Sequence, residues 1–214
     1  TKKLIRLALA SAPLGLVAWL TTLFVSIPRL TMDKVLGKEQ LGYFAAVSSL
    51  LVVGNLFIGA LGQTASPRLA RYFVESPKGY LMLVFKLLGL SFLLGMAGIL
   101  LSVFFGRQIL TLLFTPDYAA YSGLFVWVMT AAAILFIFSG LNIALTAARC
   151  FKSQVPIYAV SAVVAAAFSF YTIPRYGVIA GAWSQVACYI AGSMGCMIYL
   201  IRVYKRQNKA FDLI

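Results

Sequence analysis

The chain has no histidine and only five acidic residues among its 214 residues. Without histidine it cannot form a serine–histidine dyad, a histidine-ligated haem or the common histidine-containing zinc sites. Four acidic residues lie between apolar segments and the fifth lies in the tail, so no apolar segment holds a pair of carboxylates. They are Asp33, Glu39, Glu75, Asp117 and Asp212.

Cysteine motifs and phosphate-binding loops are also missing. The three cysteines, Cys150, Cys188 and Cys196, lack the spacing of a metal site or a redox pair. No glycine-rich loop of the Walker type is present. The sequence therefore argues against an intramembrane enzyme, and we expect no metal and no cofactor.

Apolar residues are abundant instead. Hydrophobic residues make up 62% of the chain and charged residues 11%, with a mean hydropathy of +0.95, which is far from the composition of a water-soluble domain. A transmembrane helix needs about 20 mostly apolar residues. Six segments qualify, and backbone polar groups in lipid require them to be helices. We predict an all-α integral membrane protein, a single six-transmembrane-helix bundle over residues 1–214 with spans at 7–27, 41–62, 80–105, 121–147, 156–173 and 178–201.

The net charge of +13 follows a membrane pattern. Twelve of the 18 basic residues flank the spans on the side of the two termini, five flank them on the other side, and Lys86 lies inside the third span. Short loops rich in lysine and arginine stay in the cytoplasm. We therefore predict that both termini are cytoplasmic, that the basic tail from residue 202 lies on membrane lipids, and that no nucleic acid is bound.

A proline and a charged segment separate the first two spans. The first span is predicted to end at Pro28, a charged loop to follow over residues 28–40, and the second span to begin at Leu41. Arg29 would then lie at the outer mouth of the bundle. It could anchor the helix at lipid headgroups or contact a phosphate, for which its planar guanidinium is well suited.

Few polar side chains lie within the spans, and each has two interpretations. Lys86 is a functional candidate as an ionisable residue inside a span, or it extends its amine to the cytoplasmic interface. Asn55, Asn142 and Gln185 could face a cargo or form hydrogen bonds between helices. Because basic residues outnumber acidic ones, the sequence favours an anionic cargo over a cationic one.

Several short motifs together resemble the later part of polysaccharide-biosynthesis flippases. The opening Ile27-Pro28-Arg29, followed by Leu36-Gly37 and Leu41-Gly42-Tyr43-Phe44, is similar to the start of the second half of these O-antigen and exopolysaccharide transporters. They belong to the superfamily of multidrug, oligosaccharidyl-lipid and polysaccharide exporters. The remaining similar motifs are Ala65-Ser66-Pro67-Arg68-Leu69-Ala70-Arg71-Tyr72, Thr115-Pro116-Asp117-Tyr118, Leu145-Thr146-Ala147-Ala148-Arg149 and Ile173-Pro174-Arg175-Tyr176-Gly177.

The resemblance implies a fold and a function. Such flippases have two six-helix lobes around a cation-lined cavity that opens alternately to each side of a bacterial inner membrane. This chain, which begins with Thr1 rather than methionine, would be the carboxy-terminal lobe of that MATE-like fold, with an amino-terminal lobe as its partner. It would flip a polyprenyl-pyrophosphate-linked oligosaccharide. For the anionic cargo we predict contacts from Arg29, Lys86 and Arg149, and for its sugars from Asn55 and Asn142.

Two other functions stay open at this stage. A lobe of a multidrug exporter is one, although the cation coupling of such a carrier calls for a buried carboxylate, which no span supplies. The other is a membrane scaffold that transports nothing and binds a polysaccharide polymerase or glycosyltransferases.

Overall fold

A computed structural model describes the backbone of residues 2–211 and the side chains of residues 15–151 and 153–205. Six long helices follow one another: α1 (Lys2–Leu36), α2 (Lys38–Glu75), α3 (Pro77–Leu113), α4 (Ser122–Ala147), α5 (Phe151–Tyr176) and α6 (Ile179–Phe211). A short 3-10 helix, η1 (Pro116–Tyr121), precedes α4, and the described residues form no strand. All six long helices are long and apolar enough to cross a membrane, which confirms the prediction of an all-α membrane bundle.

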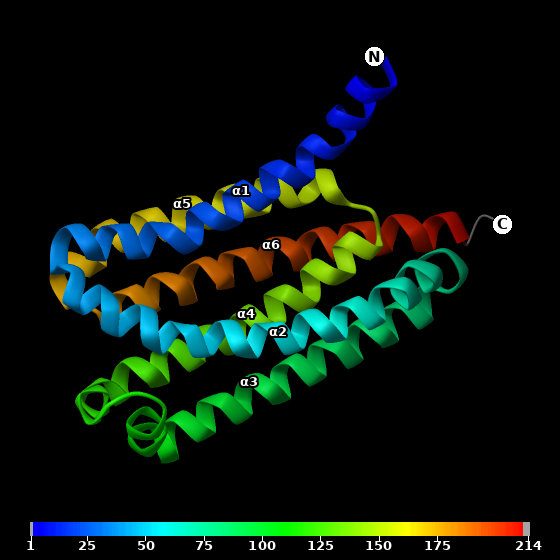
Figure 1. Ribbon diagram of the computed structural model, residues 1–214. Coiled ribbons are helices and arrows are strands. Elements are labelled where there is room, and N and C mark those ends of the chain that lie inside the picture. The colour runs from blue at the N-terminus through cyan, green and yellow to red at the C-terminus, as the bar shows by residue number, and fades with distance from the viewer. Residues whose placement is uncertain (1, 212–214) are drawn as a thin grey trace.

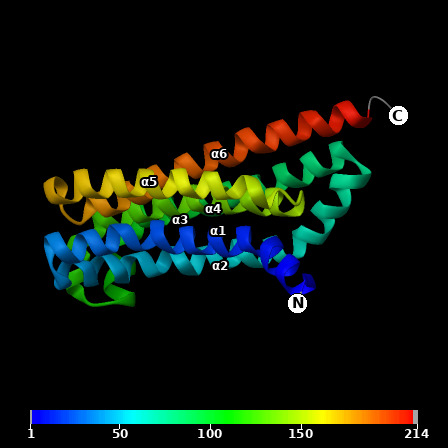
Figure 2. The same ribbon diagram turned by 90° about the horizontal axis from the view of Figure 1, so that it is seen from above.

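The six helices run back and forth along one common direction, so both ends of the chain lie at the same end of the bundle (Figures 1 and 2). We call this end the terminal end and the other the far end. Helix α4 packs on α2, α3 and α6, while α5 packs on α1 and α6. Helices α4 and α6 therefore join a pair, α1 with α5, to a second pair, α2 with α3.

The first helix does not end at Pro28. Helix α1 continues to Leu36, and the buried ring of Pro28 lies within it. A proline is tolerated inside a membrane helix where its neighbours surround the local break in hydrogen bonding. The chain turns instead at Gly37, whose φ of 84° is readily accessible only to glycine. The predicted loop over residues 28–40 was therefore wrong, and most of its charged residues lie on the last turns of α1 and the first turn of α2.

The apolar spans also underestimate the length of most helices. Helix α2 extends to Glu75, whereas its span was predicted to end at residue 62, and α3 extends to Leu113 rather than residue 105. Hydropathy identifies the part of a helix that lies in hydrocarbon, and the helical backbone continues beyond it into polar residues.

Glycines allow the central helices to approach closely. Gly54 and Gly62 of α2 face the side chains of Phe136 and Ile143 of α4, and Gly95 of α3 lies against the backbone of Ala133. Small residues are common where membrane helices pack, because lipid gives no hydrophobic driving force between them and close contact must supply the attraction. These contacts place α4 at the centre of the bundle, with α2 and α3 against it.

Candidate functional site

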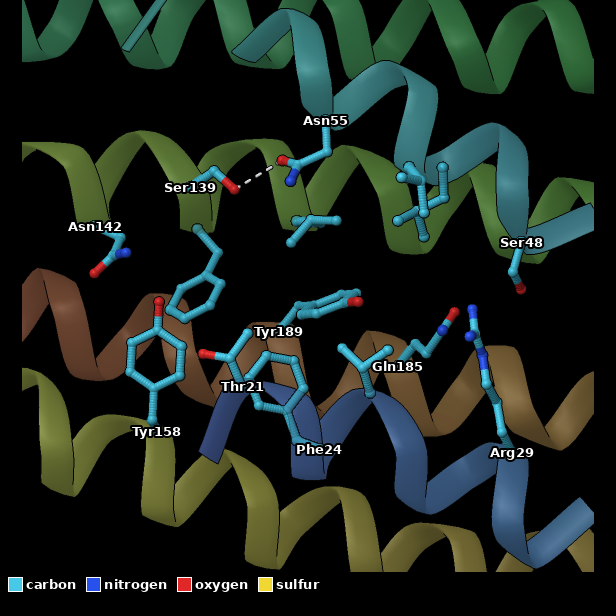
Figure 3. Close-up of a pocket in the computed structure, with 15 residues that line it drawn as sticks. Thr21, Phe24, Arg29, Ser48, Asn55, Ser139, Asn142, Tyr158, Gln185 and Tyr189 are labelled. Carbon is cyan, nitrogen blue, oxygen red and sulfur yellow. Dashed lines mark hydrogen bonds between the residues drawn. The ribbon is translucent and has the colours of Figure 1, made fainter. Parts of the chain in front are cut away.

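A pocket of about 330 Å³ lies between α1 and α2 and is backed by α4 and α6 (Figure 3). The two helices at its mouth pack mainly on other elements, α1 on α5 and α2 on α4, which leaves space between them. Most of its lining residues recur at the spacing of a helix face, such as Ser48, Leu51, Val52 and Asn55 on α2. The pocket therefore lies among the helices of the bundle, in the part that hydropathy assigns to the membrane.

Arg29 is the charged residue of this pocket. It extends from α1 across the pocket, and its guanidinium is directed toward Ser48 of α2 and Gln185 of α6 (Figure 3). Its Nε is buried and has no hydrogen-bond partner among the described residues. The extension of α1 past Pro28 produces this placement, because it carries Arg29 on a helix face rather than in a loop.

Several polar side chains line the pocket, and they are only partly satisfied. The hydroxyl of Ser139 donates to Oδ1 of Asn55 across a distance of 2.9 Å (Figure 3). The hydroxyl of Ser48, Oδ1 of Asn142 and Oε1 of Gln185 are buried without a partner in the described part of the chain. A buried polar atom without a partner is costly, and such atoms commonly mark the place of a water or a ligand.

Aromatic rings form one wall of the pocket. Phe24 of α1, Phe138 of α4, Tyr158 of α5 and Tyr189 of α6 pack on one another, with ring centroids between 5.4 and 6.5 Å apart. The hydroxyl of Tyr158 is directed toward Asn142, at the opposite end of the pocket from Arg29 (Figure 3). The wall fixes the positions of four helices around the polar groups and leaves the pocket amphipathic.

The electrostatics of the pocket favour an anion. No acidic residue is among the described residues that line it. The one ion pair in the described part of the chain joins Arg71 Nε and Glu75 at 2.8 Å, on the exposed surface of α2. A guanidinium without a carboxylate, held in a partly closed site of low polarity, can attract a phosphate more strongly than the same group in water. Within the described residues, no three histidine, cysteine or acidic residues are grouped to hold a metal ion.

The structure brings three of the five predicted site residues together. Arg29, Asn55 and Asn142 all line the pocket. Lys86 lies instead in a separate groove between α2 and α3, beside Arg68. Arg149 is exposed in the turn between α4 and α5, where its φ is 56°.

Sequence reasoning missed several lining residues. Ser48, Ser139 and Tyr158 were not among the predicted contacts, although a signal for two of them existed. Ser48 lies seven residues before Asn55, and Ser139 lies three before Asn142, so each pair shares a helix face. Tyr158 could not be found in this way, because only the packing of α5 on α1 brings it to the pocket.

The polarity of the bundle in the membrane stays a prediction. Arg202 and Lys205 of the basic tail lie on α6, which remains helical to Phe211, and residues 212–214 lie outside the described part. The common end of the two termini agrees with an even number of crossings (Figure 1).

Comparison with known proteins gives one match of moderate similarity. The chain is 29% identical over 174 residues to a protein of Staphylococcus aureus named capsular polysaccharide biosynthesis protein CapF. The match covers 79% of this chain and 43% of that protein, so the chain spans less than half the length of the curated relative. No protein-family model matches the chain, and no solved structure matches it.

Proposed function

We propose that the chain is one lobe of a transporter that flips a polyprenyl-pyrophosphate-linked oligosaccharide across a bacterial inner membrane for surface polysaccharide synthesis. The similar protein is named for capsular polysaccharide biosynthesis, and a bundle of six apolar helices is suited to the membrane steps of such a process. The observation that carries the proposal is Arg29, a cation without an acidic partner among the described residues, in a pocket where several other polar atoms also lack partners.

Arg29 would hold the pyrophosphate. A guanidinium keeps its charge when it is removed from water and donates two parallel hydrogen bonds to phosphate oxygens. Its buried Nε is one unused donor, and the guanidinium is directed into the pocket rather than toward lipid (Figure 3). Binding there would pair the guanidinium with one of the two negative charges of the pyrophosphate and shield the cargo's most polar part from hydrocarbon.

Sugar hydroxyls match the other polar groups of the pocket. Asn55, Asn142 and Gln185 offer both donors and acceptors, and the buried oxygens of Asn142 and Gln185 are free to accept. The aromatic wall would cover the apolar faces of the sugar rings. This side chain set fits an oligosaccharide better than a cationic drug, because the described pocket contains no carboxylate.

A second lobe would complete the site. The mouth of the pocket lies between α1 and α2, and Val52, which lines it, and Leu56 one turn later on α2 are exposed apolar side chains. The chain spans less than half the length of its curated relative, which leaves room for another lobe. Two such lobes rocking against each other would open the pocket to each side of the membrane in turn, while the polyprenyl tail stays in lipid.

Lys86 and Arg149 are not needed for this mechanism. Both lie outside the pocket, and their contact with the cargo stays a prediction that no interaction in the described residues supports. The cytoplasmic position of the termini is part of the proposal and rests on the distribution of basic residues.

Reconstitution of the full-length protein tests the proposal. Fluorescent lipid-linked oligosaccharide would be placed in one leaflet of proteoliposomes, and its appearance in the other leaflet would be measured with a reagent that cannot cross. We expect translocation by the wild type, a loss of at least 100-fold in Arg29→Gln, and retention in Arg175→Gln. Arg175 is the matched control, because it is an exposed cation near the far end, 4.0 Å from the Tyr171 ring and outside the pocket.

If the wild type translocates nothing and a glycosyltransferase or polymerase copurifies stably with it, the proposed transport function is wrong and the protein is a scaffold. If it translocates a cationic dye but not the oligosaccharide, the protein is a lobe of a drug exporter.

A further inference from the structure

The groove that contains Lys86 lies on a different side of the bundle from the pocket. It has a volume of about 370 Å³ and is formed by one face of α2 and one face of α3. The α2 face contributes Leu61, Thr64, Ala65 and Arg68, and the α3 face contributes Leu83, Lys86, Leu87 and Leu90. On each helix these residues recur three or four positions apart, so the groove is a continuous feature of both surfaces.

Two cations lie at similar depth in this groove. Arg68 lies seven residues before the end of α2, and Lys86 lies nine residues after the start of α3. At a rise of about 1.5 Å per residue, both are roughly 10 to 14 Å from the hairpin that joins the two helices. The groove therefore presents two positive charges about two turns inside the terminal end.

No carboxylate neutralises either cation among the described residues. Glu75 is paired with Arg71, while Asp33, Glu39 and Asp117 lie at the far end of the bundle. The hydroxyl of Thr64 is already used as a donor to the carbonyl of Leu61 at 2.9 Å. The groove thus has two cations in excess and a wall of leucine side chains.

The surroundings of the groove are those of a lipid-facing surface. Met82 and Phe85, on the same turns of α3 as Lys86, are 63% and 68% exposed. Two unpaired cations beside such residues are costly in hydrocarbon unless an anion joins them. Basic pockets between membrane helices near the cytoplasmic surface are suited to phosphate headgroups of lipids.

We propose that the groove between α2 and α3 binds an anionic phospholipid, with the phosphodiester between Arg68 and Lys86 and one acyl chain along Leu83, Leu87 and Leu90. This site is distinct from the pocket with Arg29 and does not depend on the transport of any cargo. The phosphodiester of a bound lipid would offset one of the two positive charges of the groove and hold the α2–α3 hairpin in the leaflet of the terminal end.

Native mass spectrometry of the purified full-length protein in neutral detergent tests this proposal without cargo. The probes are phosphatidylglycerol and phosphatidylcholine with identical acyl chains, titrated separately. We expect preferential retention of phosphatidylglycerol, about a fivefold loss of affinity in Arg68→Gln or Lys86→Gln, and about a 25-fold loss in the double variant. Arg68→Lys, which keeps the charge, should retain binding.

Lys78→Gln is the matched control, because Lys78 is exposed at the same end and does not line the groove. An equal loss in Lys78→Gln, or unchanged binding in a folded double variant, would overturn the proposal. Displacement of the lipid by millimolar inorganic phosphate would identify a free-phosphate site instead. Displacement by polyprenyl pyrophosphate at far lower concentration than phosphatidylglycerol would assign the groove to the cargo. Either result contradicts an ordinary phospholipid site and leaves the function of the Arg29 pocket to its own test.

Discussion

The most apolar windows of α3 and of the segment that contains α4 have the same mean hydropathy, yet α3 is largely exposed and α4 is largely surrounded by protein. Half of the residues in the most apolar window of the α4 segment are buried in the bundle, against 22% in that of α3. Helix α4 is in contact with α2, α3 and α6 and lines the pocket, whereas α3 exposes a long series of large apolar side chains. Apolar composition therefore shows that both segments lie in the membrane, and the few polar and small residues show which faces meet protein.

The same contrast separates the two cation sites. Arg29 is directed into the interior among unpaired amides, and Lys86 lies on the lipid-facing side among leucines. An interior cation can act on a cargo that passes through the protein, while a surface cation acts on the lipid around it. The first three experiments below each compare an interior residue with a residue on the lipid-facing side.

The largest expected difference is between Arg29 and Lys86. Arg29→Ala should abolish surface polysaccharide in cells, because the cargo's pyrophosphate loses its counter-charge in the pocket. Lys86→Gln should lower polymer by no more than about fivefold, through the loss of one lipid contact. Polymer is measured by immunoblot at matched membrane protein levels. Equal defects in the two variants would break the distinction between the two sites.

Glycines on α3 allow the same comparison for stability. A side chain at Gly95 would meet the backbone of Ala133 on α4, which cannot move aside, whereas Gly89 has no neighbour within 4 Å. We expect Gly95→Leu to lower the free energy of unfolding by about 3 kcal/mol or more, and Gly89→Leu to change it by less than about 0.5 kcal/mol. Unfolding in mixed micelles of increasing denaturing detergent measures both. A tolerated leucine at position 95 would contradict the packing of α3 on α4.

The loss of a hydrogen bond should change stability by a smaller amount, and the interior and lipid-facing positions should differ less. Ser139→Ala removes the bond to Asn55 between α4 and α2, and leaves the amide oxygen unpaired, with an expected cost of about 1 kcal/mol. Thr64→Ala removes a bond within one turn of α2 and should cost less than about 0.5 kcal/mol. A double-mutant cycle of Asn55→Ala with Ser139→Ala should give a coupling energy of about 0.6 kcal/mol. A coupling energy of zero would mean that the two side chains do not interact.

The smallest effect concerns the cysteines. Cys150 lies in the turn between α4 and α5, and its partial burial raises the pKa of its thiol above the ordinary value. Less thiolate is then present at a given pH, so alkylation of Cys150 should reach its half-maximal rate at a higher pH than a fully exposed cysteine introduced at Lys78. The buried Cys188 and Cys196 should not react with a charged reagent at a measurable rate in the folded protein. An alkylation profile of Cys150 that matches the introduced cysteine would contradict the burial.

The same labelling experiment also determines which side of the membrane the terminal end faces. With cytoplasmic termini, a charged maleimide should modify Cys150 in inverted vesicles and not in intact cells, since the turn between α4 and α5 lies at the terminal end (Figure 1). Modification in intact cells alone would reverse the topology.

The number and type of the helices could be predicted from sequence, and part of the site could as well. Asn55 and Asn142 were found because an amide inside an apolar segment is conspicuous. The position of Arg29 on a helix face could not be predicted, because a proline such as Pro28 locally indicates the end of a helix. In the folded bundle the ring of Pro28 is buried by its neighbours, and the helix continues past it. Lys86 lies within the third apolar helix, as its sequence predicts, but the neighbour that its side chain meets depends on how α3 packs against α2. Helix faces can be read from spacing, while contacts between helices distant in sequence, such as Tyr158 with the pocket, depend on the packed bundle.

Binding of cargo to the purified full-length protein tests the central claim most directly. Isothermal titration with a short polyprenyl-pyrophosphate-linked oligosaccharide would compare the wild type with Arg29→Gln and Arg175→Gln. The account predicts binding that free pyrophosphate weakens, that Arg29→Gln removes and that Arg175→Gln preserves. Equal affinity in the wild type and Arg29→Gln would show that the pocket between α1 and α2 is not where the anionic cargo is held.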